Sequence, residues 1–305
     1  MLTRDQVLRA VYHCQHHSTD GTARTSCLAA RLAVTGPSVT ARVQELAAAG
    51  LVRMSDNESG HATPPAEAPV PPPSPLRVLF EDYHLLIVNK PAPLLTQAPP
   101  AVPNLEALAK AYIKAKHDKP AGVYLGVPHR LDRPVSGVIC FARNTKAAQR
   151  VHAQFADHSV RKVYWALVEG TVSPAAGVWD DWVRKVPDEA RVERAAEGEP
   201  GAKLATLEYR VLRAFPDFTL VELSPLTGRM HQLRVQAAWR GHPVLGDAQY
   251  GGTRPFGPAA ELPRDRVIAL HARRLTLTHP FTKLALTAEA PVPDYWPSVL
   301  NEPVA

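Results

Sequence analysis

A carboxylate between two arginines marks the segment 128–137, which reads PHRLDRPVSG. Asp132 lies between Arg130 and Arg133, just before an apolar stretch with the pattern of a β-strand. Arginines that pack near a carboxylate favour its ionised form, and an ionised carboxylate at a strand mouth can act as a nucleophile or general base. An Asp–Arg pair that only braces a loop explains the same residues, and on these ten alone it is slightly the better interpretation.

A tyrosine on a neighbouring strand is a second candidate. The segment 161–170 reads RKVYWALVEG, and the alternation of a strand places Lys162 and Tyr164 on one face. A tyrosine on a strand that faces a site can stack on a nucleobase and offer its hydroxyl. A tyrosine at a sheet margin with no such role is the common alternative.

A third group of polar side chains follows in the segment LTGRMHQLRV. Its Thr-Gly pair predicts a turn into a helix, and the amides at a helix N-terminus favour anions. Arg229 and His231 are therefore candidates to face phosphate. Arg234 lies three residues after His231, so both side chains can occupy one face of the helix.

Two other clusters favour structural roles. The segment GHPVLGDAQYGG, residues 241–252, indicates an ordered loop, more structural than chemical. The segment YHCQHH, residues 12–17, contains residue types that ligate zinc, but adjacent helical residues point in different directions and cannot converge on one ion. We expect a solvated helix end there, and neither a metal nor a cofactor in the protein.

The elements that must position these side chains follow from hydrophobic periodicity and turn residues. Helices are predicted over residues 105–117 and 145–157, and strands over residues 77–80, 85–88, 138–142, 163–168, 207–212 and 219–223. Because strands often follow strands directly, the sequence predicts an α+β fold with a mixed, largely antiparallel sheet.

A proline-rich stretch divides the chain into two parts. Residues 55–76 hold few large apolar residues and seven prolines between Pro64 and Pro75, so we expect an extended linker. It separates a small unit, residues 1–54, from a large domain, residues 77–300. The small unit has the helix–turn–helix layout, with Pro37 placed to open its third helix. A helical module that binds no nucleic acid is an equal alternative.

Composition limits the function classes. The net charge of +6 and pI of about 9.3 suit a polyanionic partner, although many basic proteins bind no nucleic acid. No apolar run reaches the roughly 18 residues that span a bilayer, and the N-terminus lacks a signal-peptide layout. Three scattered cysteines form neither a disulfide framework nor a metal pair. We expect a cytoplasmic monomer without membrane contact.

Several motifs together resemble one family. The segments HRLDRPVSG, KVYWALVEG, LTGRMHQLRV, GHPVLGDAQYGG and ALHARRLTLTHP occur in the order found in the RluA family of pseudouridine synthases, and VLFEDYHLLIVNKPAPLL resembles that family's start. The resemblance covers about residues 77–300. The segment SCLAARLAVTGPSVTARVQELAAAGLV also resembles the winged-helix part of repressors of the DtxR and MarR kinds, and makes Ser38, Thr40 and Arg42 candidate contacts to nucleic acid.

The RluA-family resemblance implies specific roles. Asp132 matches the catalytic aspartate, Tyr164 the tyrosine that packs on the uracil, and Arg234 the arginine that pairs with the aspartate. Arg130 matches an arginine that takes the place of the extruded nucleotide, whereas Arg229 and His231 match RNA-facing positions. The implied fold is that of the pseudouridine synthases, with no cofactor.

Two departures from the family pattern are present. Val135 stands where many relatives have threonine, and the N-terminus shows no S4 RNA-binding domain but the helix–turn–helix-like unit instead. We therefore expect an RNA pseudouridine synthase acting on rRNA or tRNA, with a further nucleic-acid or protein contact through residues 1–54. The alternative function is a nucleic-acid-binding regulator whose C-terminal domain binds RNA without catalysis.

Overall fold

The computed structural model describes residues 76–99, 102–118 and 122–297. The predicted N-terminal unit and almost all of the predicted linker lie outside these residues. The described chain begins with β1 (Arg77–Glu81), β2 (Leu85–Lys90), α4 (Leu105–Lys116), β3 (Ser136–Ala142), α5 (Thr145–Ala156) and β4 (Arg161–Glu169). It continues with β5 (Ala176–Lys185), β6 (Val192–Ala195), β7 (Lys203–Ala214), β8 (Phe218–Pro225), α6 (Gln232–Trp239), the 3-10 helices η1 (Ala248–Tyr250) and η2 (Pro263–Asp265), β9 (Leu270–Thr278) and β10 (Ala285–Glu289).

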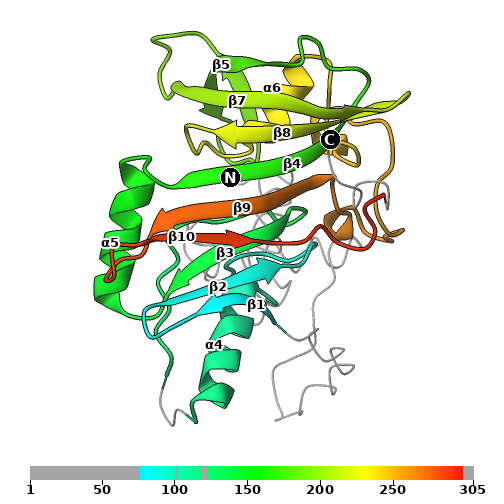
Figure 1. Ribbon diagram of the computed structural model, residues 1–305. Helices are drawn as coiled ribbons and strands as arrows, with labels where there is room; N and C mark the ends of the chain where they lie inside the picture. The colour runs from blue at the N-terminus through cyan, green and yellow to red at the C-terminus, as the bar shows by residue number, and fades with distance from the viewer. Residues whose placement is uncertain (1–75, 100–101, 119–121, 298–305) are drawn as a thin grey trace, which may run out of the picture. The chain divides into compact units, whose positions relative to one another are not determined.

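A ten-stranded sheet runs through this part of the protein in the order β1-β2-β3-β9-β4-β8-β7-β5-β6 (Figure 1). β10 pairs with β9 beside this path. All pairs are antiparallel except β3 with β9, where Ser136 lies opposite His271 and Gly137 opposite Ala272. The predicted mixed, largely antiparallel sheet is therefore confirmed.

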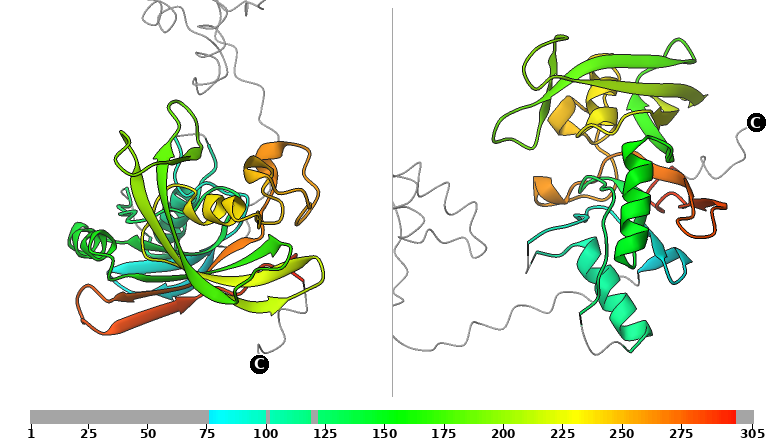
Figure 2. Two further views of the ribbon diagram at one scale, coloured as in Figure 1. Left: turned by 90° about the horizontal axis from the view of Figure 1, so that it is seen from above. Right: turned by 90° about the vertical axis from the view of Figure 1, so that its left-hand side faces the viewer.

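Two hydrophobic cores lie on opposite sides of the first three strands. Leu86 and Val88 pack with the buried side of α4, whereas the alternate residues Leu85 and Ile87 pack with Val151 of α5 and with β9 and β10. The alternation of β2 thus serves both cores. Figure 2 shows α4 and α6 on one side of the curved sheet, in which β9 and β10 are neighbouring strands.

The two helices begin where their sequences provide caps. Asn104 accepts a hydrogen bond from the Ala107 amide at the start of α4, and Asn144 accepts one from the Ala147 amide at the start of α5. Both helices end within one residue of the predicted positions.

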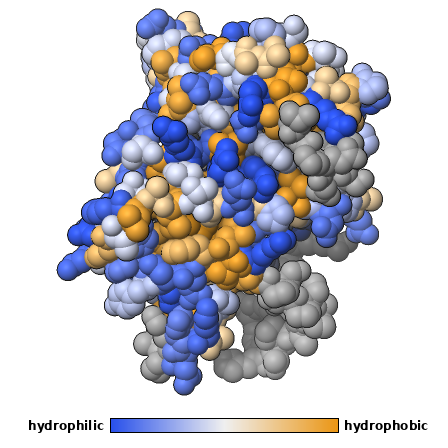
Figure 3. All heavy atoms as spheres, viewed as in Figure 1, coloured by the Kyte–Doolittle hydropathy of each residue, from blue (hydrophilic) through white to orange (hydrophobic). Residues whose placement is uncertain are grey.

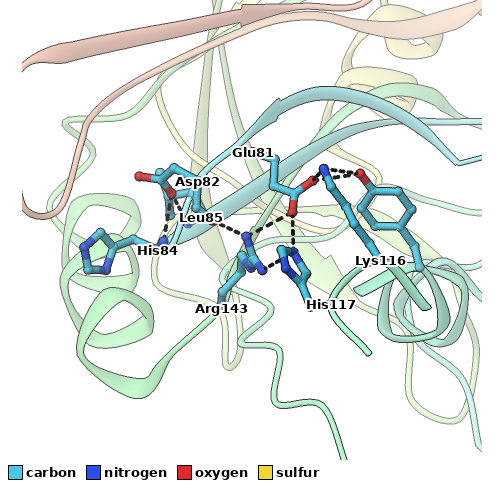
Figure 4. Close-up of polar contacts among 8 residues, drawn as sticks. Glu81, Asp82, His84, Leu85, Lys116, His117 and Arg143 are labelled. Carbon is cyan, nitrogen blue, oxygen red and sulfur yellow. Dashed lines mark hydrogen bonds and ion pairs between the residues drawn. The ribbon is translucent and has the colours of Figure 1, made fainter. Parts of the chain in front are cut away.

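A partly buried carboxylate, that of Glu81, connects the end of β1 to the end of α4 (Figure 4). Glu81 accepts hydrogen bonds from Tyr112 and Lys116 at 2.7 Å and contacts His117 and Arg143 at 3.0 Å. Burial alone raises the pKa of Glu81, but the hydrogen bonds from Lys116, His117 and Tyr112 outweigh it and lower the pKa to about 2. The cluster therefore fixes α4 against the edge of the sheet.

Close backbone contact explains one glycine. Gly137 has φ +119°, and a Cβ atom there would lie 2.3 Å from the carbonyl oxygen of Ala272. Only glycine permits β3 and β9 to approach this closely directly after the segment that carries Asp132.

The face seen in Figure 3 mixes hydrophilic and hydrophobic side chains, with hydrophobic ones gathered near the middle of the sheet. Among the described residues, no helix has the length and hydropathy needed to cross a membrane.

Candidate active site

The loop that carries Asp132 is fixed by a second loop, which follows β2. The Thr96 hydroxyl donates to the carbonyl of Leu131 at 2.9 Å and accepts from the Leu131 amide at 3.1 Å. The Leu94 amide donates to the carbonyl of Arg133 at 3.0 Å. These bonds fix the backbone of Leu131 and Arg133, the two neighbours of Asp132. They therefore restrict the direction in which the Asp132 side chain can point.

A fully buried lysine lies beneath the same two loops. The Lys90 ammonium, at 0% exposure, donates to the carbonyls of Leu94 at 2.6 Å, Pro91 at 3.1 Å and Arg133 at 3.3 Å. Burial lowers the pKa of Lys90 to about 7, helped by the charge of Arg133 and opposed by that of Asp132. Lys90 therefore binds the loop that follows β2 through two carbonyl oxygens and the Asp132 loop through a third, that of Arg133.

The partner of Asp132 comes from far along the chain. Arg234 of α6 donates through Nη1 to Oδ2 of Asp132 at 3.2 Å, and the Asp132 side chain remains 31% exposed. The neighbouring arginines do not form this pair: Arg133 binds Asp265 at 2.9 Å, and Arg130 has no ion pair within the described residues. The sequence left open whether the arginines of the loop pack near the carboxylate, and the ion pair with Asp265 shows that the guanidinium of Arg133 has another partner.

Arg234 is itself held by a buried carboxylate. Asp247 accepts from its Nε at 2.6 Å and from its Nη2 at 2.8 Å, and Gln249 accepts from Nη2 at 2.8 Å. The guanidinium also lies over the ring of Tyr250 at 5.0 Å. Burial lowers the pKa of Arg234, but the bonds and charge of Asp247 and then of Asp132 raise it above the ordinary value. A fixed cation thus faces Asp132.

Two glutamines anchor α6 to the sheet. Gln232 donates to the Thr206 carbonyl of β7 at 3.0 Å and accepts from the Arg229 amide at 3.0 Å. Gln236 donates to the buried carboxylate of Asp181 at 2.8 Å. The helix begins only at Gln232, because Gln232 holds the preceding residues in an irregular turn; the prediction that it begins near the Thr-Gly pair is wrong.

Two side chains of β4 lie near the Asp132 loop: Tyr164 is close enough to feel the charge of Asp132, and Lys162 lies near His129. Burial, and then the charge of Asp132, raise the pKa of Tyr164, which favours the neutral phenol. Lys162 is half-buried. The pKa of His129 is lowered mainly by burial and to a smaller extent by the charge of Lys162. Burial lowers the pKa of Lys162, which has no hydrogen bond or ion pair within the described part of the chain.

The three predicted RNA-facing residues differ in their surroundings. Arg130 is exposed. Arg229 donates through Nε to the Leu204 carbonyl at 3.0 Å. His231 lies close to the predicted catalytic group, with Nε2 at 3.7 Å from Oδ2 of Asp132 and its side chain 11% exposed.

Comparison with known proteins identifies the family. Residues 84–239 match a family model described as RNA pseudouridylate synthase. A tRNA pseudouridine synthase C from Salmonella typhi is 36% identical over 238 residues, which cover 74% of this chain and 89% of that protein. The chain belongs to the RNA pseudouridylate synthase family. These matches support the predicted isomerase, an RNA pseudouridine synthase, over the alternative of a non-catalytic regulator.

Other synthases of this family extend the comparison. A ribosomal large subunit pseudouridine synthase C from Vibrio vulnificus (strain CMCP6) is 33% identical over 216 residues, which cover 70% of this chain but 65% of that longer protein. The solved structure of human RNA pseudouridylate synthase domain containing 4 has a TM-score of 0.59 and 27% identity, over 72% of this chain and 90% of that one. Residues 1–59 match a model described as the N-terminal DNA-binding domain of iron-dependent repressors, in line with the predicted helix–turn–helix unit.

Several residues that shape this synthase's site were not singled out in the sequence. Lys90 follows an apolar strand, where a buried cation has no local sign, and Asp247 lies in the loop predicted to be structural. Only the side-chain contacts show that Asp247 acts on Asp132 through Arg234. The order of the charges along the chain gives no hint of that connection.

Proposed function

We propose that this synthase isomerises specific uridines of tRNA or rRNA, with Asp132 as the group that acts on the ribose. The supporting observation is the ion pair between the partly exposed Asp132 and the buried Arg234. Similar synthases are named for both kinds of RNA, tRNA pseudouridine synthase C and ribosomal large subunit pseudouridine synthase C. The proline of the HRLDRP segment, Pro134, resembles the motif of relatives that act on tRNA, which slightly favours tRNA as the substrate.

The proposed reaction needs no redox step. The bond from C1′ to N1 breaks, the uracil turns, and C1′ forms a bond to C5. The proton of C5 is lost and N1 gains one, so the atoms of the nucleotide balance. Asp132 acts as a nucleophile at C1′ or as a base at C2′, and the chain's residues support both routes.

Two neighbours support this chemistry. Arg234 keeps a positive charge beside Asp132 while Asp247 prevents the guanidinium from turning away. Tyr164 supplies an aromatic ring on which the extruded uracil can pack, and its raised pKa makes it a neutral hydrogen-bonding group.

Cationic side chains around the loop are proposed to contact the RNA. Arg130 is exposed and would fill the position that the target nucleotide leaves in its stack. Arg229 has further N–H groups besides the one given to the Leu204 carbonyl. Lys162 adds a half-buried ammonium for which a backbone phosphate would be a suitable partner. The family resemblance implies an RNA contact for His231 as well, although its side chain is only 11% exposed.

Residues 1–54 are proposed to form a winged-helix-like unit that binds nucleic acid or a protein partner. The match of residues 1–59 to a repressor DNA-binding model supports this proposal. Ser38, Thr40 and Arg42 are its candidate contacts. A cytoplasmic location and a monomeric state complete the proposal.

The substrate can be identified in cells. Pseudouridines are mapped in tRNA and rRNA from cells with and without the gene, and from cells that carry Asp132→Asn. The proposal expects at least one uridine to lose its modification both without the gene and with the variant. Identical maps in all three would contradict it.

A further inference from the structure

His231 is the second nitrogen donor group that reaches Asp132. Its Nε2 lies 3.7 Å from Oδ2, the same oxygen that accepts from Arg234 at 3.2 Å. Within the described residues no hydrogen bond reaches Oδ1. The two contacts on one oxygen therefore leave the other free to meet a substrate.

The imidazole of His231 is fixed from its other side. Nδ1 lies 2.8 Å from the hydroxyl of Tyr250, and the two rings meet edge to face at 5.6 Å. The Tyr250 oxygen already accepts from the Val192 amide of β6 at 3.1 Å. Its hydroxyl hydrogen is thus available to Nδ1, and such donation leaves the ring hydrogen on Nε2, which faces Asp132.

The backbone of His231 also has an unusual conformation. Its φ is +52°, in the left-handed region, and it directly precedes α6. Histidine and asparagine are among the few residues with side chains that adopt this region readily. The turn fixed by Gln232 imposes this conformation and places the imidazole between Tyr250 and Asp132.

We propose that His231 is a positioning residue of the synthase: held by Tyr250, it places its Nε2–H group toward Oδ2 of Asp132, at an N–O distance of 3.7 Å, and with Arg234 directs Oδ1 at the ribose. This inference rests on the proposed role of Asp132. It assigns His231 to the carboxylate rather than to the RNA. Burial lowers the pKa of His231 by more than the charge of Asp132 raises it. The net pKa lies below the ordinary value, so the ring is neutral near neutral pH.

The test uses two substitutions that differ in reach. His231→Asn keeps a residue suited to the left-handed backbone but cannot reach Asp132, whereas His231→Gln carries an amide nitrogen at about the position of Nε2. The rate of tritium release from 5-tritiated uridine is measured in a single turnover with saturating RNA from cells that lack the gene. RNA affinity is measured separately with the same RNA.

The proposal expects His231→Asn to react about tenfold more slowly with unchanged RNA affinity, and His231→Gln to recover most of the rate. A normal rate in His231→Asn, weaker RNA binding with an unchanged rate, or an equal loss in both variants would overturn it. Inactive wild-type protein would instead contradict the proposed function itself.

A second substitution guards against misfolding of the His231 variants. Tyr250→Phe keeps the ring beneath Arg234 and removes only the hydroxyl, and it should also slow the reaction without weakening RNA binding. Tyr209→Phe, on β7, is the matched control. It also removes one tyrosine hydroxyl, which donates to the Pro174 carbonyl at 3.2 Å and not to His231. Equal rates for the two tyrosine variants would contradict the proposal.

Discussion

At the scale of single residues, the site is a series of charged groups in contact that begins with the buried carboxylate of Asp247. Asp247 fixes Arg234, and Arg234 contacts Asp132, 102 residues earlier in the chain. The guanidinium thus has a buried carboxylate on one side and a partly exposed one on the other. The buried carboxylate, that of Asp247, holds the guanidinium through two hydrogen bonds.

Asp247→Asn tests this dependence. The amide preserves the shape but removes the charge and gives one N–H to a site that needs two acceptors, so Arg234 loses part of its support. We expect the free energy of unfolding in urea to fall by about 1–3 kcal/mol. Pseudouridine formation should fall with it, and an unchanged stability would show that Asp247 does not hold Arg234.

Lys162→Met tests the half-buried cation of β4. Methionine preserves most of the packing of the stem, so the expected effect is on RNA affinity. A lysine that contacts phosphate contributes about one unit to the slope of log affinity against log salt. We expect the variant to lose that contribution in a salt titration. The exposed Lys283→Met is the control, and equal slopes for wild type and Lys162→Met would argue against the contact.

The sequence made some of these residues predictable. Resemblance to the family connected Asp132, Tyr164 and Arg234, and the structure brings the aspartate and the arginine into contact. Lys90 and Asp247 could not be predicted, because each acts through contacts between loops that are far apart in the sequence.

At the scale of elements, the strands β1, β2, β3, β4, β7 and β8 were predicted from the sequence, whereas β5, β6, β9 and β10 were not. β5 places Trp179, Asp181 and Val183 inward, and the buried Asp181 breaks the apolar pattern because it pairs with Arg240 and Gln236. β9 carries two adjacent arginines at a register shift against β4. Such strands are recognisable only when their partners are known.

Glu81→Gln tests how α4 is held to the sheet. The pKa of Glu81 is about 2 in the folded protein against an ordinary 4.5, so its ionised form contributes stability above pH 4.5. That contribution is lost as the pH falls from about 4.5 to about 2. We expect the stability difference between wild type and Glu81→Gln to shrink over this range. Urea unfolding at several pH values measures it, and a constant difference would contradict the account.

At the scale of the whole molecule, two family models match different parts of the chain, residues 84–239 and residues 1–59. Asp132, Arg234 and His231 all belong to the first of these parts. The N-terminal unit, with its match to a repressor domain, adds a second candidate contact with nucleic acid. Catalysis and recruitment are thus expected to be separable.

Deletion of residues 1–75 tests this separation. We expect the remainder to fold and to form pseudouridine, with weaker affinity for its RNA because one contact region is lost. The rate at saturating RNA and the affinity are compared with those of the full chain. Loss of activity at saturating RNA would show that the N-terminal unit contributes to the chemistry.

The central claim is that the charge of Asp132 drives the isomerisation, and Asp132→Asn removes that charge with almost no change in shape. Purified wild type and variant are incubated with RNA from cells that lack the gene, and pseudouridine is measured directly. We expect the variant to bind the RNA as the wild type does and to form no pseudouridine. Substantial turnover by Asp132→Asn would contradict the account.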